Sequence, residues 1–241
     1  MGRNREVIDN NDRWQPDWSP EPLSGDYPDL DLAITDCFAA ERLCLNSATL
    51  PDFVISIWNR DTHAEEKYEW ISKARENTYR NPIVLVTEFD DVSPHEVDDP
   101  GSPKIEDIER ILRITRPLRE ASSTSTRVLI HCAAGISRSS STALAILASI
   151  TRRREPALPA EEVARRAFRG VGRAVVQTYA RGWREHTVWD PNALVVRAAD
   201  KLLGLSGALL ARRASGYGDP WGDDRNNRPD GDWDRYDDQG G

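Results

Sequence analysis

One short segment of the chain combines a nucleophile, a cation and a tight backbone loop. It reads HCAAGISRS and places five residues between Cys132 and Arg138, with Gly135 inside the loop. This spacing lets successive backbone N–H groups point inward and form a concave nest for a tetrahedral dianion. Gly135 supplies a backbone conformation with positive φ, which a side chain would resist in so tight a turn. The segment therefore predicts a phosphate-binding loop.

The charged groups of this loop predict a reaction at a bound phosphate. The planar fork of Arg138 can hold two phosphate oxygens and follow the charge as it spreads in the transition state. A helix N-terminus and a nearby guanidinium favour the thiolate, so Cys132 is expected to attack phosphorus and form a cysteinyl-phosphate. Ser139 is placed to donate a hydrogen bond to the leaving sulfur. His131 is expected to orient the loop rather than to act as a base.

Alternating apolar runs and helical patterns place this loop between a strand and a helix. Buried strands are predicted at residues 31–35, 53–58, 83–89 and 127–132, from their length and β-branched content. Helices are predicted at residues 64–79 and 105–119, where apolar residues recur three and four apart. Strands alternating with helices indicate an α/β fold with a mainly parallel central sheet flanked by helices.

Further helices and two polar tails complete the expected organisation. Residues 137–153 and 161–168 have helical patterns, and Asp190 as cap with Pro191 at the first position marks the start of a last helix. We expect a disordered or extended segment over residues 1–28, one catalytic domain over 29–213 and a disordered acidic tail over 214–241.

Composition argues against several other classes of protein. The formal net charge is -8, so counterion release gives no general reason to bind nucleic acid or an anionic membrane. No apolar run approaches the length of a membrane span, and the N-terminus lacks the apolar stretch of a secretory signal. We expect a cytoplasmic protein that needs no cofactor and no metal, and that binds neither nucleic acid nor membrane.

The three cysteines are too few and too irregularly spaced for a disulfide framework or a zinc site. Cys37 and Cys44 lie seven positions apart in a predicted helix, which favours structural thiols. The alternative is a redox role of one of them with Cys132.

The segment HCAAGISRS resembles the active-site pattern of the cysteine-based phosphatases, and its GISRS ending is similar to the dual-specificity branch of the protein-tyrosine-phosphatase superfamily. The similarity extends over residues 30–212, because PNALVVRAADKLLG resembles the closing segment of small bacterial predicted tyrosine phosphatases. The resemblance implies a tyrosine-phosphatase-like fold, with Cys132 and Arg138 as catalytic residues beside a separate aspartic general acid. The residues expected to bind the phosphate are His131, Ala133, Ala134, Gly135, Ile136, Ser137 and Ser139.

The resemblance places the general acid on a loop after the strand that precedes the strand of the nucleophile. Asp91 is the first candidate, because it ends IVLVTEFDD at the edge of the sheet where the Cys132 loop also lies. Asp90 is an alternative, since a one-residue change of strand register exchanges the two. Asp98 and Asp99 lie closer to the next helix and remain open as well.

Asp190 precedes a proline, as does the acid of the low-molecular-weight tyrosine phosphatases. In that family the nucleophile loop lies near the N-terminus, so Asp190 is interpreted here as a helix cap.

The substrate is expected to be a phosphorylated protein or a small phosphomonoester. Apart from Arg138 the loop is uncharged, whereas phosphoinositide phosphatases of this superfamily add lysines there. The arginines that follow could attract an acidic substrate or form a solvated face; they are Arg152, Arg153, Arg154, Arg165, Arg166 and Arg169. The sequence indicates no oligomeric state.

Two rival functions stay open. One is an adaptor that binds phosphate without turnover, which an unsuitable acid loop would produce. The other is an arsenate reductase or thiol oxidoreductase, which needs a resolving cysteine close to Cys132.

Overall fold

The computed structural model describes residues 26–45, 50–62, 72, 82–93, 95–96, 98–119, 126–177 and 190–215. The strands are β1 (Leu30–Asp36), β2 (Phe53–Trp58), β3 (Ile83–Glu88), β4 (Thr126–Cys132) and β5 (Val175–Gln177). The helices are α1 (Cys37–Leu45), α3 (Ile105–Ile114), the 3-10 helix η2 (Arg116–Arg119), α4 (Arg138–Arg154), α5 (Ala160–Arg173), α6 (Ala193–Leu203) and α7 (Ala208–Ala214). The predicted helix at 64–79 and most of both predicted tails lie outside the described residues.

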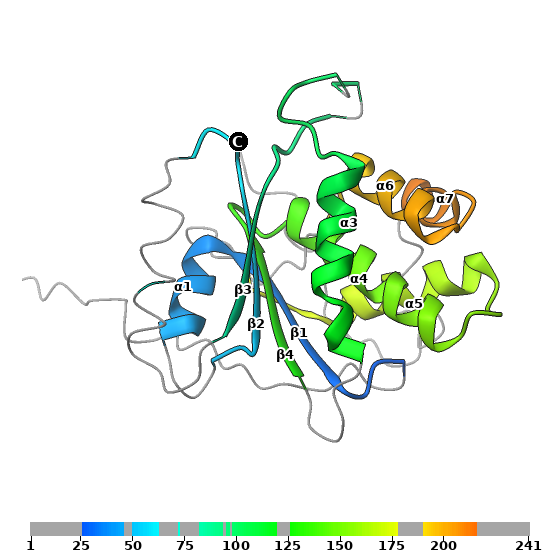
Figure 1. Cartoon of the computed structure of the whole chain (residues 1–241), viewed down its shortest axis with the longest axis horizontal. Helices are drawn as coiled ribbons and strands as arrows, with labels where there is room; N and C mark the ends of the chain where they lie inside the picture. The colour runs from blue at the N-terminus through cyan, green and yellow to red at the C-terminus, as the bar shows by residue number, and fades with distance from the viewer. Residues whose placement is uncertain are drawn as a thin grey trace, which may run out of the picture.

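The five described strands form one parallel sheet in the order β3-β2-β4-β1-β5. Figure 1 shows α1 on one face of this sheet and α3 to α7 on the other. Helices cover both faces of the sheet, which explains why β2 and most of β4 are buried along their length, whereas β3 at the edge is partly exposed. The predicted α/β fold with a parallel central sheet is confirmed.

Two apolar clusters hold these layers together. Side chains alternate across β1, so Ala33 packs with α1 while Leu32 and Ile34 pack into the larger cluster on the opposite face. Helix α4 runs through the middle of that larger cluster and is buried over its first 14 residues, from Arg138 to Thr151. Its position fixes the start of α4 directly against the end of β4.

The start of α4 is unusually rich in hydroxyl side chains for a buried helix. Ser140 and Ser141 each donate to the carbonyl oxygen of Ser137, at 3.0 and 2.8 Å. Such bonds back to the preceding turn satisfy hydroxyl groups that are buried away from water. The first turn of α4 can therefore be both polar and buried.

The carboxyl ends of parallel strands meet at one edge of the sheet, where ligands of α/β proteins bind. The register pairs Asp36 at the end of β1 with Cys132 at the end of β4, and Trp58 with Glu88 at the ends of β2 and β3. The loop that follows Cys132 starts from this edge.

Two predicted helix boundaries are wrong. The cap of the last helix is Asn192, whose Oδ1 accepts from the N–H groups of Leu194 at 2.9 Å and Val195 at 3.3 Å. Asp190 lies too early to reach these N–H groups, and its carboxylate accepts from Arg213 instead.

The helix predicted at 105–119 ends at Ile114 and continues as the short η2. A proline at position 117 disfavours the α conformation of the residue before it, which accounts for the break. Within the described residues, no helix is both long and apolar enough to cross a membrane.

Candidate active site

The loop between β4 and α4 is packed tightly against the end of β1. Gly135 has φ 72°, and a Cβ there would lie 2.6 Å from the backbone carbon of Thr35 and 2.7 Å from the nitrogen of Asp36. A side chain at this position would meet both a strained backbone conformation and a rigid strand. Only glycine lets the loop take this path.

Cys132 is 2% exposed, and its sulfur lies beneath this loop. It accepts a hydrogen bond from the backbone N–H of Gly135 at 3.2 Å, and Ser139 Oγ lies 3.4 Å away. The amide of Gly135 therefore points inward, and α4 begins with its N-terminus beside the sulfur. Both the N–H and the helix dipole stabilise negative charge at this point.

The guanidinium of Arg138 is buried at the same site and held from two neighbouring strands. Its Nη1 donates to Oδ1 of Asn59, after β2, and to the carbonyl of Phe89, after β3, at 3.1 Å. Its Nε is buried and, within the described residues, has no hydrogen-bond partner. A buried donor without a partner is costly, and a bound anion would satisfy it.

His131 lies on the core side of the loop and is fully buried. Its ring meets the ring of Trp58 edge to face, with centroids 5.7 Å apart. Burial lowers the pKa of His131 from 6.5 to about 3, so the imidazole is neutral at physiological pH. This location suits a side chain that orients the loop.

The segment after β3 reaches the loop between β4 and α4 through Asp91. Its Oδ1 accepts from Ser137 Oγ at 2.7 Å and from Asn192 Nδ2 at 2.9 Å. Asp91, Cys132 and Arg138 line one cavity of about 470 Å³. Its remaining lining residues are Val92, Ser93, Ala133, Ala134, Ile136, Ser137, Asp190, Asn192, Ala193 and Arg213.

The other candidate aspartates do not line this cavity. Asp90 accepts from the backbone N–H of Arg60 at 2.9 Å, and its carboxylate lies so close to Gly101 that a Cβ there would be 1.8 Å from Oδ2. Asp99 accepts from the N–H of Gly101 at 2.7 Å, and Asp98 is exposed in the same turn. Of the four, Asp91 is the one that the structure brings to Cys132.

The sequence patterns above did not indicate three residues of the site: Asn59, Asn192 and Arg213. Asn192 caps α6 and donates to both Asp91 Oδ1 and the carbonyl of Val92, the latter at 3.0 Å. Asparagine is among the strongest N-cap residues, so its place directly before ALVV was a usable signal. Asn59 and Arg213 follow no local pattern that indicates a site.

The thiol of Cys37 contacts the loop that follows Cys132. Cys37 is half-buried at the start of α1, and its thiol donates to the carbonyl of Ala133 at 3.7 Å. Burial is the main cause that raises its pKa, which keeps it a protonated donor. Cys44 is fully buried between α1 and the sheet, and burial raises its pKa to about 12, as expected of a structural thiol.

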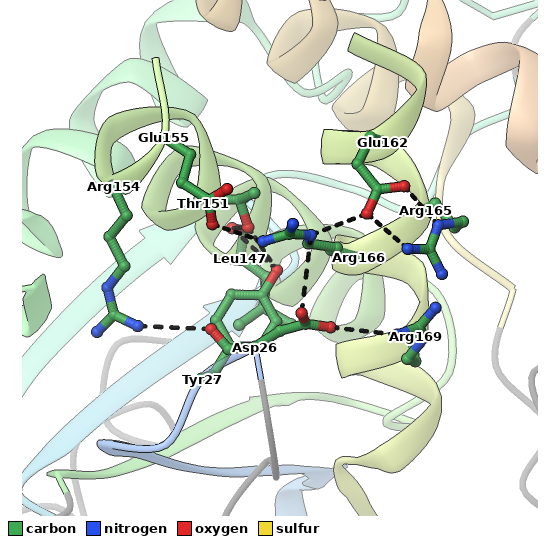
Figure 2. Close-up of polar contacts among 10 residues, drawn as sticks. All are labelled: Asp26, Tyr27, Leu147, Thr151, Arg154, Glu155, Glu162, Arg165, Arg166 and Arg169. Atoms are coloured by element: carbon green, nitrogen blue, oxygen red, sulfur yellow. Dashed lines mark hydrogen bonds and ion pairs between the residues drawn. The ribbon is translucent and has the colours of Figure 1, made fainter. Parts of the chain in front are cut away.

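Four of the six arginines after the loop form ion pairs with carboxylates, and Arg152 donates to the backbone carbonyls of Pro156 and Leu158. None of the six lines the cavity. Figure 2 shows Asp26 joined to both Arg166 and Arg169. Arg165 is the main cause that lowers the pKa of Glu162 to about 2. These ion pairs tie the chain before β1 to the α4–α5 pair, which favours a structural face over an attractor of substrate.

Within the described part of the chain, no group of three or more His, Cys, Asp or Glu side chains is arranged to hold a metal ion. The arrangement that the structure does contain is a buried cysteine, a buried guanidinium, the inward backbone N–H of Gly135, and the carboxylates of Asp91 and Asp190 at a cavity. Such a site can bind an oxyanion and supply both a nucleophile and a proton.

No family model matches the chain, and no curated protein matches it. Among solved structures, the chain is similar to the Yvh1 phosphatase domain from Chaetomium thermophilum, with 21% sequence identity and a TM-score of 0.46. The similarity covers 75% of this chain and 94% of that domain. A likeness of this degree carries no argument about function, so the chemistry rests on the geometry of the site.

Proposed function

We propose that the protein is a phosphomonoester hydrolase of the protein-tyrosine or dual-specificity phosphatase type, working through a cysteinyl-phosphate. The observation that supports this most is the pairing of a buried Cys132 sulfur with a buried Arg138 guanidinium whose Nε lacks a partner within the described residues. A phosphate in the loop would satisfy that donor and place phosphorus against the sulfur. The segment HCAAGISRS, with its dual-specificity-like ending, supports the same assignment.

In the first step, the Cys132 thiolate attacks phosphorus and the bond to the leaving oxygen breaks. Asp91 supplies the proton to that oxygen: its Oδ1 is held by Ser137 and Asn192, so Oδ2 carries the proton. In the second step, water attacks the cysteinyl-phosphate while the Asp91 carboxylate takes its proton. Phosphate leaves, and Ser139 stabilises the sulfur as it departs.

The direct test compares hydrolysis of p-nitrophenyl phosphate and phenyl phosphate by the wild type, Cys132→Ser and Asp91→Asn. Cys132→Ser should abolish turnover of both substrates. Asp91→Asn should remove the basic limb of the pH profile and slow phenyl phosphate by about 10²-fold or more, because phenoxide leaves poorly without a proton. An unchanged pH profile in Asp91→Asn would show that another residue is the general acid.

The adaptor and the reductase predict different results in the same assays. Phosphate or vanadate binding by the wild type without any turnover would identify an adaptor. Arsenate reduction that is lost in Cys37→Ser would identify a reductase, and Cys44→Ser is its matched control because Cys44 lies away from the loop.

A further inference from the structure

A second guanidinium faces the cavity from the last described helix. Arg213, in α7, lines the same cavity as Cys132. Its Nε donates to the carbonyl of Pro191 at 2.5 Å, and its Nη2 donates to Asp190 Oδ1 at 3.1 Å. Nη1 takes part in neither of these hydrogen bonds. The side chain is therefore anchored through Nε and Nη2, and Nη1 can donate to a ligand.

The two cations of the cavity wall differ in what they can bind. Arg138 is 4% exposed and lies at the nucleophile, where it contacts the reacting phosphate in the proposed mechanism. The side chain of Arg213 is 28% exposed and that of its partner Asp190 is 64% exposed. An ion pair with so exposed a carboxylate is weak and open to exchange, whereas the bond to the Pro191 carbonyl keeps the guanidinium oriented.

The cavity is also larger than the reacting group alone requires. Its volume of about 470 Å³ falls within the range of sites that take whole small ligands. Apart from the two arginines, Asp91, Asp190 and Cys132, the described lining is apolar or uncharged and includes Ile136 and Ala193. A leaving group can lie along this wall and present a further charge to Arg213.

We propose that Arg213 makes the enzyme selective for phosphomonoesters whose leaving group carries a second anionic group. This inference rests on the proposed function and names its substrate class. The guanidinium would receive a carboxylate or a second phosphate in place of Asp190, with the fork geometry that suits either. Asp190 then acts as an internal competitor, which an anionic substrate displaces.

The test uses three peptides with the same phosphotyrosine leaving group: one with neutral neighbours, one with a neighbouring glutamate and one with a neighbouring phosphoserine. The wild type should hydrolyse at least one anionic peptide with a kcat/KM about tenfold above that of the neutral peptide at low salt. Arg213→Gln should reduce this ratio to near 1, and Asp190→Asn should raise it. The preferred peptide identifies whether the second group is a carboxylate or a phosphate.

Arg212→Gln is the matched control, because Arg212 stacks over Phe168 at 5.9 Å and does not line the cavity. It should leave the ratio unchanged. Should Arg213→Gln not fold, Arg213→Lys should retain part of the ratio, and the wild-type ratio should fall as salt screens the contact.

Equal hydrolysis of all three peptides by the wild type would overturn the inference while leaving the phosphatase intact. Equal slowing of all three peptides by Arg213→Gln would also overturn the inference. Arg213 would then only hold α7 against the segment before α6. Absence of turnover on every peptide and on p-nitrophenyl phosphate would instead refute the proposed function.

Discussion

Asn192 offers the sharpest test of how the proposed acid is held. One side chain, 5% exposed, performs two separable tasks. Its Oδ1 caps α6 through Leu194 and Val195, while its Nδ2 donates to Asp91 Oδ1 and the Val92 carbonyl. Asn192→Ser keeps a capping oxygen but lacks the length to reach Asp91. Asn192→Ala removes both functions.

The two variants should therefore differ in stability and agree in activity. Both variants lose the hydrogen bonds of Nδ2, so Asn192→Ser should be destabilised by about 1 kcal/mol. Loss of an N-cap costs about 0.5–2 kcal/mol, so Asn192→Ala should be destabilised by about 1 kcal/mol more than Asn192→Ser. Loss of one of the two donors to Asp91 removes a hydrogen bond worth about 1 kcal/mol when Asp91 is protonated and acts as the acid. That free energy corresponds to about a fivefold decrease in kcat when the acid must be in place.

The assay measures kcat for phenyl phosphate and p-nitrophenyl phosphate, with urea unfolding run in parallel. Both variants should slow phenyl phosphate by about fivefold and p-nitrophenyl phosphate much less, because p-nitrophenolate leaves without much help from an acid. Ser137→Ala removes the other donor to the same oxygen, and its effect should be non-additive with Asn192→Ser. This account would be refuted if Asn192→Ser hydrolysed phenyl phosphate as fast as the wild type, or if it slowed both substrates equally.

Two further predictions concern the loop and its histidine. Gly135→Ala should abolish hydrolysis and cost more stability than Gly204→Ala: both glycines have positive φ, worth about 1–2 kcal/mol of strain, but a Cβ at Gly204 meets nothing within 4 Å. Thermal unfolding measures the loss of stability in each variant, and equal losses would show that the contact with Thr35 has no effect. The pKa of His131 is lowered in the folded protein, so the neutral ring stabilises the fold above pH 6.5 and this contribution is lost as pH falls toward 3. Between pH 8 and pH 5 the free energy of unfolding should fall by about 2 kcal/mol more in the wild type than in His131→Gln, and equal slopes in urea unfolding would contradict the burial argument.

The sequence was sufficient where the determining residues are contiguous. The runs IVLVTEF and RVLIHC predicted strands because a parallel sheet covered by helices needs unbroken apolar segments. The loop was predictable because its spacing and its glycine are local properties, and the structure gives Gly135 the positive φ that this required.

Prediction was weaker wherever the deciding contact joins distant segments. Asp90 and Asp91 differ by one position, and no local rule separates them. Their roles are decided by Gly101 and the Arg60 backbone, which hold Asp90, and by Ser137, which contacts Asp91. The same reason explains the wrong cap: Asp190 is a good capping residue by type, but a tertiary contact with Arg213 takes its carboxylate.

These long-range contacts have a common geometry that bears on mechanism. Asn59 and the carbonyl of Phe89 hold the guanidinium of Arg138 from the ends of β2 and β3, while Asn192 holds the loop of Asp91 from the start of α6. The buried hydroxyl-rich turn of α4 fixes the loop between them. Charged groups that must act on one phosphorus atom are thus each positioned by a separate rigid element, which limits the reorganisation needed in the transition state. Weakening one anchor should therefore misplace one group and leave the others in position. This is why the Asn192 variants are expected to affect the proton donor and not the binding of phosphate, and why Ser137→Ala, which keeps the backbone N–H groups of the loop, is expected to do the same.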